Sequence, residues 1–318
     1  MKRLLCLALL CAGIAAAQKP TPLILDTDIG DDIDDALALA LVLQSPEVDL
    51  RLITTVSGDV ESRGRLVWKE LGVYGRQDIP LATGGSTPQS RQGFPNHAAQ
   101  FKILRPEDQP PDAASRNAVT AIAQTLNSSA GKITILALGP LTNIAAALKL
   151  DPAVKDKIER IVLMGGAYFR RKAEYDISQD PSAADAVFHS GVPITAVGLD
   201  VTEFFRLESQ YVEEIRDAHT PGAQFLSQLI ELWQEGDQGK LPVLYDPVAV
   251  GATLKPSLVQ TMSGTVEVET HDPTFLGVTR FTQAAGEEKG PVEVARGVNA
   301  TEFLPLFMER LTASPRGK

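Results

Sequence analysis

The fold is decided by the stretch Leu23-Ile24-Leu25-Asp26-Thr27-Asp28-Ile29-Gly30-Asp31-Asp32-Ile33-Asp34-Asp35 and by the apolar run 36–41 that follows it. The apolar residues at its start are typical of the end of a buried strand. The run 36–41 consists of Ala and Leu, both strong helix formers, and predicts a helix after the loop. Between strand and helix, six Asp residues fall within ten positions, from Asp26 to Asp35.

These six carboxylates would repel one another in a folded protein unless a cation neutralised them. A helix N-terminus explains part of the pattern, because Asp caps free backbone N–H groups and interacts well with the helix dipole, but it accounts for only about two of the six. A hard divalent cation with oxygen ligands accounts for the others, and Ca²⁺ or Mg²⁺ is the expected ion. The sequence therefore predicts a metal site in this loop.

The N-terminal segment has the features of an export signal. Lys2 and Arg3 precede an apolar run over 4–12, and Ala15-Ala16-Ala17 offers the small residues of a cleavage site. The apolar run is too short to span a membrane as a helix. We therefore expect residues 1–17 to be a signal peptide cleaved before Gln18, and the protein to be exported, either periplasmic or secreted.

The mature chain is expected to have no thiol chemistry and no lipid anchor. Cys6 and Cys11, the two cysteines of the sequence, both lie within the predicted signal peptide. Neither follows a small residue at a lipoprotein-type cleavage site. The formal net charge is −10, and removal of Lys2 and Arg3 lowers it to −12. This acidic balance argues against nucleic acid or an anionic membrane as a partner.

Residues 18–318 are expected to form a single domain, since about 300 residues lie within the range of one α/β domain. Strands are predicted at 48–56, 79–82, 132–138, 161–164 and 194–199. Helices are predicted at 61–74, 113–127, 141–150, 180–189, 208–218, 223–234 and 303–311, with a long loop at 83–111. Two or three strands are expected within 264–298, with a hairpin at one edge. This alternation predicts an α/β fold with an open, mainly parallel, Rossmann-like sheet and helices on both faces.

Four of the predicted strands end in segments suited to a site. These segments are Asp26 to Asp28, Ser57-Gly58-Asp59, Leu138-Gly139-Pro140 and Gly165-Gly166. In open α/β sheets ligands bind beyond the carboxyl ends of the strands, so we expect the four segments to meet at one crevice. Among the histidines, His97 in the long loop is the candidate for a site residue.

Seven segments then suggest a family. They are Asp26-Thr27-Asp28-Ile29-Gly30 with Asp34-Asp35-Ala36, Thr54-Thr55-Val56-Ser57-Gly58, Leu138-Gly139-Pro140-Leu141-Thr142-Asn143-Ile144-Ala145, Ile161-Val162-Leu163-Met164-Gly165-Gly166-Ala167, Ala173-Glu174-Tyr175-Asp176, Asp180-Pro181 and Tyr245-Asp246-Pro247-Val248-Ala249. With these segments in this order across nearly the whole mature chain, the protein resembles the nucleoside hydrolases of the inosine–uridine-preferring type.

The resemblance implies an enzyme that hydrolyses the N-glycosidic bond of ribonucleosides to free base and ribose, with one Ca²⁺ per subunit. It places the metal on the carboxylates of Asp28, Asp35 and Asp246 and on the backbone carbonyl of Leu138. It places Asp34 on the ribose hydroxyls, and it assigns the rest of the ribose pocket to Asp59, Met164, Glu174 and Asp176. It further implies the nucleoside hydrolase fold, a small-molecule substrate and a homo-oligomer, either a dimer or a tetramer.

The chemistry of the residues agrees with this implication. Ribosyl transfer passes through an oxocarbenium-like state, which carboxylates stabilise. A water molecule on Ca²⁺ loses its proton more easily, and a nearby carboxylate can accept that proton. Asp28 is the expected general base, and the metal is expected to orient the ribose diol as well.

Some positions depart from the family pattern. The segment Asp31-Asp32-Ile33 makes the first loop two residues longer, so that Asp32 is an alternative to Asp34. Tyr245 stands where a histidine commonly donates a proton to the leaving base, and it either takes this role or packs against the base. Asn is common where this chain has Asp59 and Asp176. The acidic pocket predicts uncharged ribonucleosides as substrates, because carboxylates repel a 5′-phosphate.

Two other functions remain open at this point. A phosphatase of the haloacid-dehalogenase type also uses D-x-D and Mg²⁺, with Asp26 as nucleophile, but this leaves Asp34-Asp35 and Tyr245-Asp246-Pro247 without a role. A non-catalytic, exported nucleoside- or sugar-binding protein on the same scaffold is the second alternative.

Overall fold

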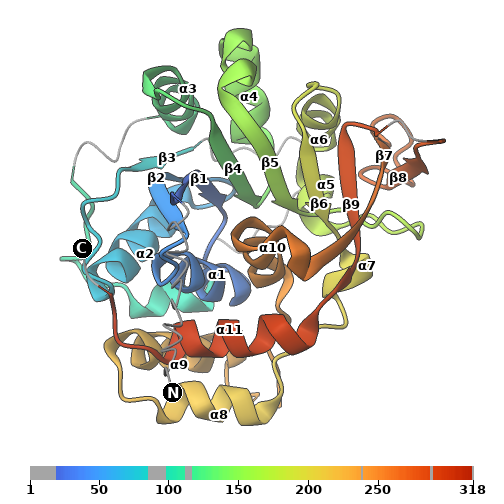
Figure 1. Cartoon of the computed structure of the whole chain (residues 1–318). Helices are drawn as coiled ribbons and strands as arrows, with labels where there is room; N and C mark the ends of the chain where they lie inside the picture. Colours follow the sequence, from blue (N-terminus) through green and yellow to red (C-terminus); the bar gives the residue numbers. More distant parts are fainter. Residues whose placement is uncertain (1–18, 85–97, 112–116, 238, 287–288, 317–318) are drawn as a thin grey trace, which may run out of the picture.

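Nine strands form one sheet among the residues that the computed structural model describes, which are 19–84, 98–111, 117–237, 239–286 and 289–316 (Figure 1). The strand order is β3-β2-β1-β4-β5-β6-β9-β7-β8. The strands are β1 (Thr21–Thr27), β2 (Val48–Thr55), β3 (Leu81–Thr83), β4 (Ile133–Leu138), β5 (Ile158–Met164), β6 (Ile194–Val197), β7 (Val259–Val268), β8 (Thr279–Gln283) and β9 (Val292–Val298). The predicted signal peptide at 1–17 lies outside the described residues.

The sheet is mainly parallel, which confirms the predicted α/β fold. Strands β1 to β6 pair in parallel, and β9 pairs in parallel with β6. Strand β7 runs antiparallel to both β8 and β9, so the predicted hairpin lies at one edge. The order of the strands reverses beside β1, where β2 and β3 follow on one side and β4 and β5 on the other. In open α/β sheets such a switch point is where ligands bind.

Helices cover both faces of the sheet. They are α1 (Asp34–Leu43), α2 (Val60–Val73), α3 (Ala118–Ser128), α4 (Thr142–Leu150), α5 (Tyr175–Gln179), α6 (Pro181–Phe188), α7 (Leu199–Thr202), α8 (Ser209–Asp217), α9 (Pro221–Gln234), α10 (Tyr245–Leu254) and α11 (Ala300–Thr312), with short 3₁₀ turns at Ala99–Ile103, Pro152–Lys157 and Pro256–Leu258. Figure 1 shows α3, α4 and α6 on one face and α1, α2 and α8 to α11 on the other. No helix of the described residues has both the length and the apolar character needed to cross a membrane.

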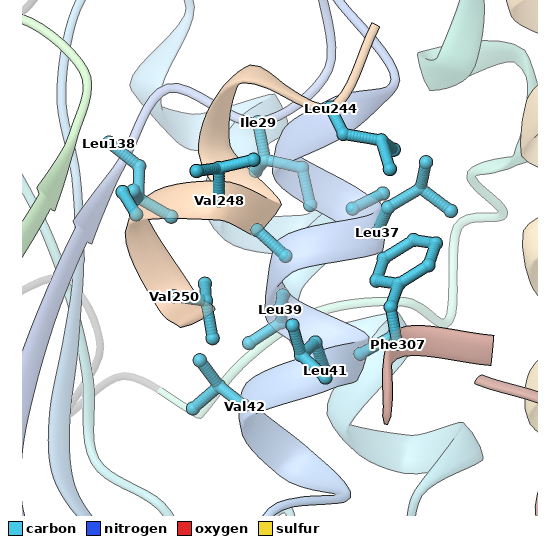
Figure 2. Packing of buried hydrophobic residues seen from close by; sticks show 14 of the residues in the cluster. Ile29, Leu37, Leu39, Leu41, Val42, Leu138, Leu244, Val248, Val250 and Phe307 are labelled. Atoms are coloured by element: carbon cyan, nitrogen blue, oxygen red, sulfur yellow. The ribbon is translucent and has the colours of Figure 1, made fainter. Parts of the chain in front are cut away.

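The apolar core lies in two layers, one on each face of the sheet, and β1 contributes side chains to both. Its alternating side chains reach both layers, since Leu23 and Leu25 belong to one apolar cluster and Ile24 to the other. Helix α1 is buried along its whole length, as expected of a helix covered by the sheet on one side and by other helices on the other. Figure 2 shows Leu37 of α1 and Val248 of α10 in the same cluster. This packing brings the N-termini of α1 and α10 together beside the end of β1.

The structure corrects some of the expected element boundaries. Helix α10 was not expected from the sequence, because Pro247 and Gly251 lower its helix propensity. Its residues are nearly all buried, so tertiary packing against α1 outweighs that propensity. The short helices α5 and α7 were not expected either. Strand β6 ends at Val197, two residues before its predicted end, since α7 begins at Leu199.

Candidate active site

A cavity of about 610 Å³ opens at the carboxyl ends of β1, β4 and β5, beside the switch point of the sheet. Its lining includes most of the residues predicted for the site, namely Asp28, Asp32, Asp34, Asp35, Leu138, Met164, Glu174, Asp176, Tyr245 and Asp246. The other lining residues are Asp31, Lys172, Ala173, Tyr175, Ser178, Leu199, Trp233 and Lys240. Segments far apart in the sequence therefore converge on one concave and strongly acidic surface.

The loop after β1 directs its carboxylates into this cavity. Gly30 allows the turn because its φ is +126°, and a side chain there would collide with the ring of Phe101. The Thr27 hydroxyl fixes Asp35 by donating a hydrogen bond to its Oδ1 at 2.5 Å. The same hydroxyl accepts a hydrogen bond from the backbone N–H of Ile29 at 3.2 Å. The turn and the helix start are thus joined by one threonine.

Asp26, the first carboxylate of the stretch, does not line the cavity. It is fully buried, and its Oδ1 accepts hydrogen bonds from the Thr54 hydroxyl and from Asn143 Nδ2, the latter at 2.8 Å. Burial raises its pKa to about 7, against the effect of these two donors. The phosphatase alternative requires Asp26 as an exposed nucleophile, so its position argues against that alternative.

Three carboxylates form the tightest acidic group. Ligand atoms of Asp34, Asp35 and Asp246 all lie within 4.8 Å of one another, and all three residues are buried. The Oδ2 of Asp34 also accepts a hydrogen bond from the backbone N–H of Asp246 at 3.1 Å, which fixes α10 against α1. This group contains Asp34, which the resemblance assigns to the ribose. Asp28, which the resemblance assigns to the metal, lies outside the tightest group but lines the same cavity.

The electrostatics of these carboxylates favour a cation. Burial, followed by the charge of Asp35, raises the pKa of Asp28 well above its ordinary value. Burial, followed by the charges of Asp34 and Asp35, does the same to the pKa of Asp246, and burial raises the pKa of Asp35 to about 7. Buried like charges of this kind are stabilised by a hard cation with oxygen ligands. The donor set therefore fits a divalent metal ion.

The end of β4 approaches this group closely. A Cβ at Gly139 would lie 2.9 Å from Asp28 Oδ1, so only glycine lets the backbone after Leu138 reach this carboxylate. Leu138 itself is the last residue of β4 and pairs in register with Thr27 of β1. The backbone of Leu138 and the carboxylate of Asp28 are thus neighbours in the cavity wall.

A buried arginine holds the loop after β1 in place. Arg63 of α2 donates from Nε to the Ser57 carbonyl at 2.8 Å and from Nη1 to the Ile29 carbonyl at 2.9 Å. The same Nη1 also donates to the Asp28 carbonyl, and Nη2 forms an ion pair with Asp31 at 2.6 Å. Its positive charge lowers the pKa of Asp28 in opposition to burial. Arg63 therefore fixes the backbone of Asp28 and joins the loops after β1 and β2.

Glu174 holds the opposite wall. Its carboxylate accepts hydrogen bonds from the backbone N–H groups of Asp176 and Ile177, both at 3.0 Å, and of Gly166 at 3.2 Å. These bonds cap α5 and attach it to the end of β5, where Met164 lines the cavity. Burial raises the pKa of Glu174, and the three N–H donors oppose this.

Aromatic and basic residues lie at the cavity alongside the acids. Tyr245 is half-buried, and burial together with the charges of Asp32 and Asp34 raises its pKa. Trp233, at the end of α9, is buried, and the Nζ of Lys240 lies 3.8 Å from the centre of its ring. Lys172 pairs with Glu203 at 3.0 Å.

One predicted site residue in the described part of the chain does not line the cavity. Asp59 is the N-cap of α2, where its Oδ1 accepts a hydrogen bond from the backbone N–H of Ser62 at 3.0 Å, and it is not among the lining residues. The Asp59 carboxylate thus serves its own helix, and its assignment to the ribose pocket stays a prediction. His97 lies outside the described residues.

Sequence reasoning missed Arg63, Lys172, Trp233 and Lys240. Tyr175 could have been found from its place between Glu174 and Asp176. The contacts of Arg63 to the two loops are mostly to backbone carbonyls, which leave no side-chain pattern in the sequence. Trp233 and Lys240 lie at and beyond the end of an amphipathic helix, where an aromatic residue and a lysine are ordinary.

Comparisons with known proteins agree with the geometry. The profile of a family described as inosine-uridine preferring nucleoside hydrolase matches residues 23–305. A pyrimidine-specific ribonucleoside hydrolase, RihA of Escherichia coli O7:K1 (strain IAI39 / ExPEC), is 34% identical over 307 residues, which cover 91% of this chain and 98% of the relative. A plant nucleoside hydrolase, PpNRh1, superposes with a TM-score of 0.82 at 29% identity, covering 92% of this chain and 99% of the other. A purine-preferring ribonucleoside hydrolase from Gardnerella vaginalis superposes with a TM-score of 0.80 at 33% identity, covering 92% and 98%.

Proposed function

Because the chain belongs to the inosine-uridine preferring nucleoside hydrolase family and is an enzyme that hydrolyses the N-glycosidic bond of nucleosides, we propose that it does so in the acidic cavity with one Ca²⁺ ion. The observation that carries this proposal is the meeting of Asp28, Asp35 and Asp246, from the loop after β1 and the starts of α1 and α10, in one cavity. Asp28, Asp35, Asp246 and the Leu138 carbonyl would hold the ion. Ca²⁺ suits such a set better than Mg²⁺, because it accepts irregular arrangements of carboxylate and carbonyl oxygens.

When bound, the ion would supply positive charge that favours deprotonation of a water molecule and orients the ribose diol. Asp28 would accept the proton of the attacking water at a carboxylate oxygen. Arg63 holds the backbone of Asp28, which limits the movement of this residue during the reaction. The carboxylates of Asp34 and Asp176 would stabilise the positive charge that develops on the sugar ring.

The ribose would be recognised by acceptors. A carboxylate can only accept hydrogen bonds, whereas each sugar hydroxyl can donate one, so Asp34, Glu174 and Asp176 suit a polyol. Both oxygens of Glu174 also accept backbone N–H groups, which holds this carboxylate in place at the cavity. The same acids would repel a phosphate, so we propose uncharged ribonucleosides, and not their 5′-phosphates, as substrates.

The names of the relatives point to opposite bases, pyrimidine for the Escherichia coli protein and purine for the Gardnerella vaginalis protein. We therefore propose ribonucleosides as the substrate class and leave the base to direct assay. Inosine and uridine represent the two kinds of base.

A reducing-sugar assay tests this function and its alternatives together. The mature protein should release free ribose from inosine or uridine, lose this activity in a chelator and recover it with added Ca²⁺. Comparison of each nucleoside with its 5′-monophosphate should show a much lower kcat/KM for the monophosphate. Saturable nucleoside binding without ribose release would instead identify a binding protein. Full activity in a metal-free preparation would show that hydrolysis does not require Ca²⁺.

A further inference from the structure

The departing base presents a problem that the acidic residues do not solve. When the bond between C1′ and the base nitrogen breaks, its electron pair goes to the base, which then needs a hydrogen-bond or proton donor. Ionised carboxylates offer no such donor, and burial raises the pKa of the half-buried phenol of Tyr245, which makes it a weaker acid than an ordinary tyrosine. A cation beside the base would meet this need.

Lys240 places an ammonium group at the cavity. Its Nζ lies 3.8 Å from the centre of the Trp233 ring and donates a hydrogen bond to the Trp233 carbonyl at 3.3 Å. Trp233 is 7% exposed, so the indole is a fixed surface against which the ammonium rests. Gln234 Nε2 donates to the Lys240 carbonyl at 2.9 Å and ties the turn after α9 to the helix. The position of this lysine is therefore set by two neighbouring residues.

Asp32 provides the opposite charge beside this lysine. Its carboxylate interacts with the charge of Lys240 and accepts a hydrogen bond from the Trp233 side chain. The backbone N–H of Ile33 donates to Asp32 Oδ1 at 2.7 Å, and Gln100 Nε2 donates to the Asp32 carbonyl at 2.6 Å. Asp32, Trp233, Lys240 and Tyr245 line the same cavity.

We propose that Lys240 is a catalytic residue that donates a hydrogen bond, and then a proton, to the departing base. The ammonium would bind a ring nitrogen or carbonyl oxygen of the base, such as the carbonyl oxygens of hypoxanthine or uracil. As the bond breaks, the electron pair goes to the base, which takes a proton from Lys240. Water supplies the hydroxyl at C1′, and Lys240 regains its proton from solvent. Asp32 and Trp233 act as positioning residues for the ammonium.

This inference rests on the proposed nucleoside hydrolysis, and two substrates separate the two claims. Inosine or uridine needs help with its leaving group, whereas 4-nitrophenyl riboside releases a stable anion that needs no donor. Lys240→Met should lower kcat on the nucleoside by about 100-fold and change kcat on the nitrophenyl riboside by less than about three-fold. Lys240→Arg keeps a positive hydrogen-bond donor but does not give up a proton, so it should stay well below the wild type on the nucleoside and close to it on the nitrophenyl riboside.

Lys102→Met is the matched control. Lys102 is an exposed lysine paired at 3.6 Å with Glu235 in the turn after α9, and it is not among the cavity-lining residues. It should behave as the wild type on both substrates, and thermal unfolding would confirm that both Met variants are folded. An equal loss of Lys240→Met on the two substrates, or no loss on the nucleoside, would overturn the role of Lys240. A wild type that cleaves neither substrate would overturn the proposed function itself.

Discussion

The loops after β1 and β2 lie next to each other at the carboxyl ends of two paired parallel strands. Each leads from a buried strand through a glycine and an aspartate into a helix. They use their carboxylates differently. After β1, Asp28, Asp34 and Asp35 face the cavity. After β2, Asp59 accepts a hydrogen bond from its own helix and contributes nothing to the lining. Similar local sequence thus serves the site in one loop and local structure in the other.

The contrast has a physical cause. Asp59 finds a donor three residues along the chain, which is the ordinary use of an aspartate before a helix. After β1, Asp34 accepts a hydrogen bond from the backbone N–H of Asp246 in α10, 212 residues along the chain. Asp28 lies close to the like charge of Asp35. Arg63 joins the two loops, since it binds the Ser57 carbonyl in one and the carbonyls of Asp28 and Ile29 in the other. The second loop therefore serves the site indirectly, by supporting the first.

The largest effect is expected from a neutral isostere in the first loop. Asp28→Asn should lower kcat by about 10⁴-fold, the upper end of what a general base supplies, since an amide cannot take the proton of the attacking water. Steady-state kinetics of ribose release measures this, with Ca²⁺ binding followed separately. Asp26→Asn is not a suitable control because Asp26 is in the core. Asp31→Asn, at another carboxylate of the cavity lining, serves as the control, and its kcat should fall far less. Near-normal turnover of Asp28→Asn would exclude this residue as the base.

Removal of the link between the loops should have the next largest effect. Arg63→Met leaves Asp31 and three backbone carbonyls without their donor in a buried place, and should lower the free energy of unfolding by about 3–5 kcal/mol. Chemical denaturation measures this. Arg65→Met, on the same helix, loses bonds to the carbonyls of Arg105 and Asp108 near the surface. It should cost less than about 1 kcal/mol. Equal losses in the two variants would show that Arg63 does not hold the loops together.

The helix that follows the second loop carries a buried acid with no role in the cavity. Burial raises the pKa of Glu70 well above its ordinary value, and neither of its carboxylate oxygens has a hydrogen-bond partner among the described residues. The native state therefore keeps the Glu70 proton to a higher pH than the unfolded chain does. As the pH rises above the ordinary pKa of a glutamate, this group lowers the free energy of unfolding.

Glu70→Met should thus raise the free energy of unfolding by about 1–3 kcal/mol at pH 8 and by less at pH 5. Thermal or denaturant unfolding at the two pH values tests the difference between variant and wild type. Glu61→Met, an exposed position of the same helix, should show no such dependence on pH. A loss of stability at pH 8 would mean that Glu70 has a favourable role in the native protein.

The smallest effect is expected in the second loop itself. Asp59→Ala removes the N-cap of α2 and should cost about 1 kcal/mol of stability. Asp59→Asn keeps an acceptor and should cost little. Since Asp59 does not line the cavity, kcat/KM of both variants should stay near the wild-type value. A large loss of activity in both variants, without a loss of stability, would place Asp59 in the site and remove the contrast between the loops.

Much of the fold and of the candidate site could be predicted from the sequence, because the patterns that indicate them are local. The apolar strands, the glycines after them and the Asp-rich stretch are continuous patterns, and most of the site residues chosen from them line the cavity. Helix α10 was missed because packing against α1 outweighs the effects of Pro247 and Gly251. The sequence could not decide the role of Asp59, because a carboxylate before a helix suits a cap as well as a site. Arg63 and Lys240 depend on partners from other loops and backbone atoms, which a linear pattern does not contain.

We propose that the carboxylates that meet at the loop after β1 hold one Ca²⁺ ion per chain. Calorimetric titration of CaCl₂ into chelator-treated protein tests it directly, with Asp35→Asn and Asp246→Asn as variants of the site and Asp59→Asn as the matched control. We predict one binding event per chain in the wild type and in Asp59→Asn, and greatly weakened binding in the other two. Absence of Ca²⁺ binding to the folded wild type, or binding that is unchanged in Asp35→Asn and Asp246→Asn, would contradict the account.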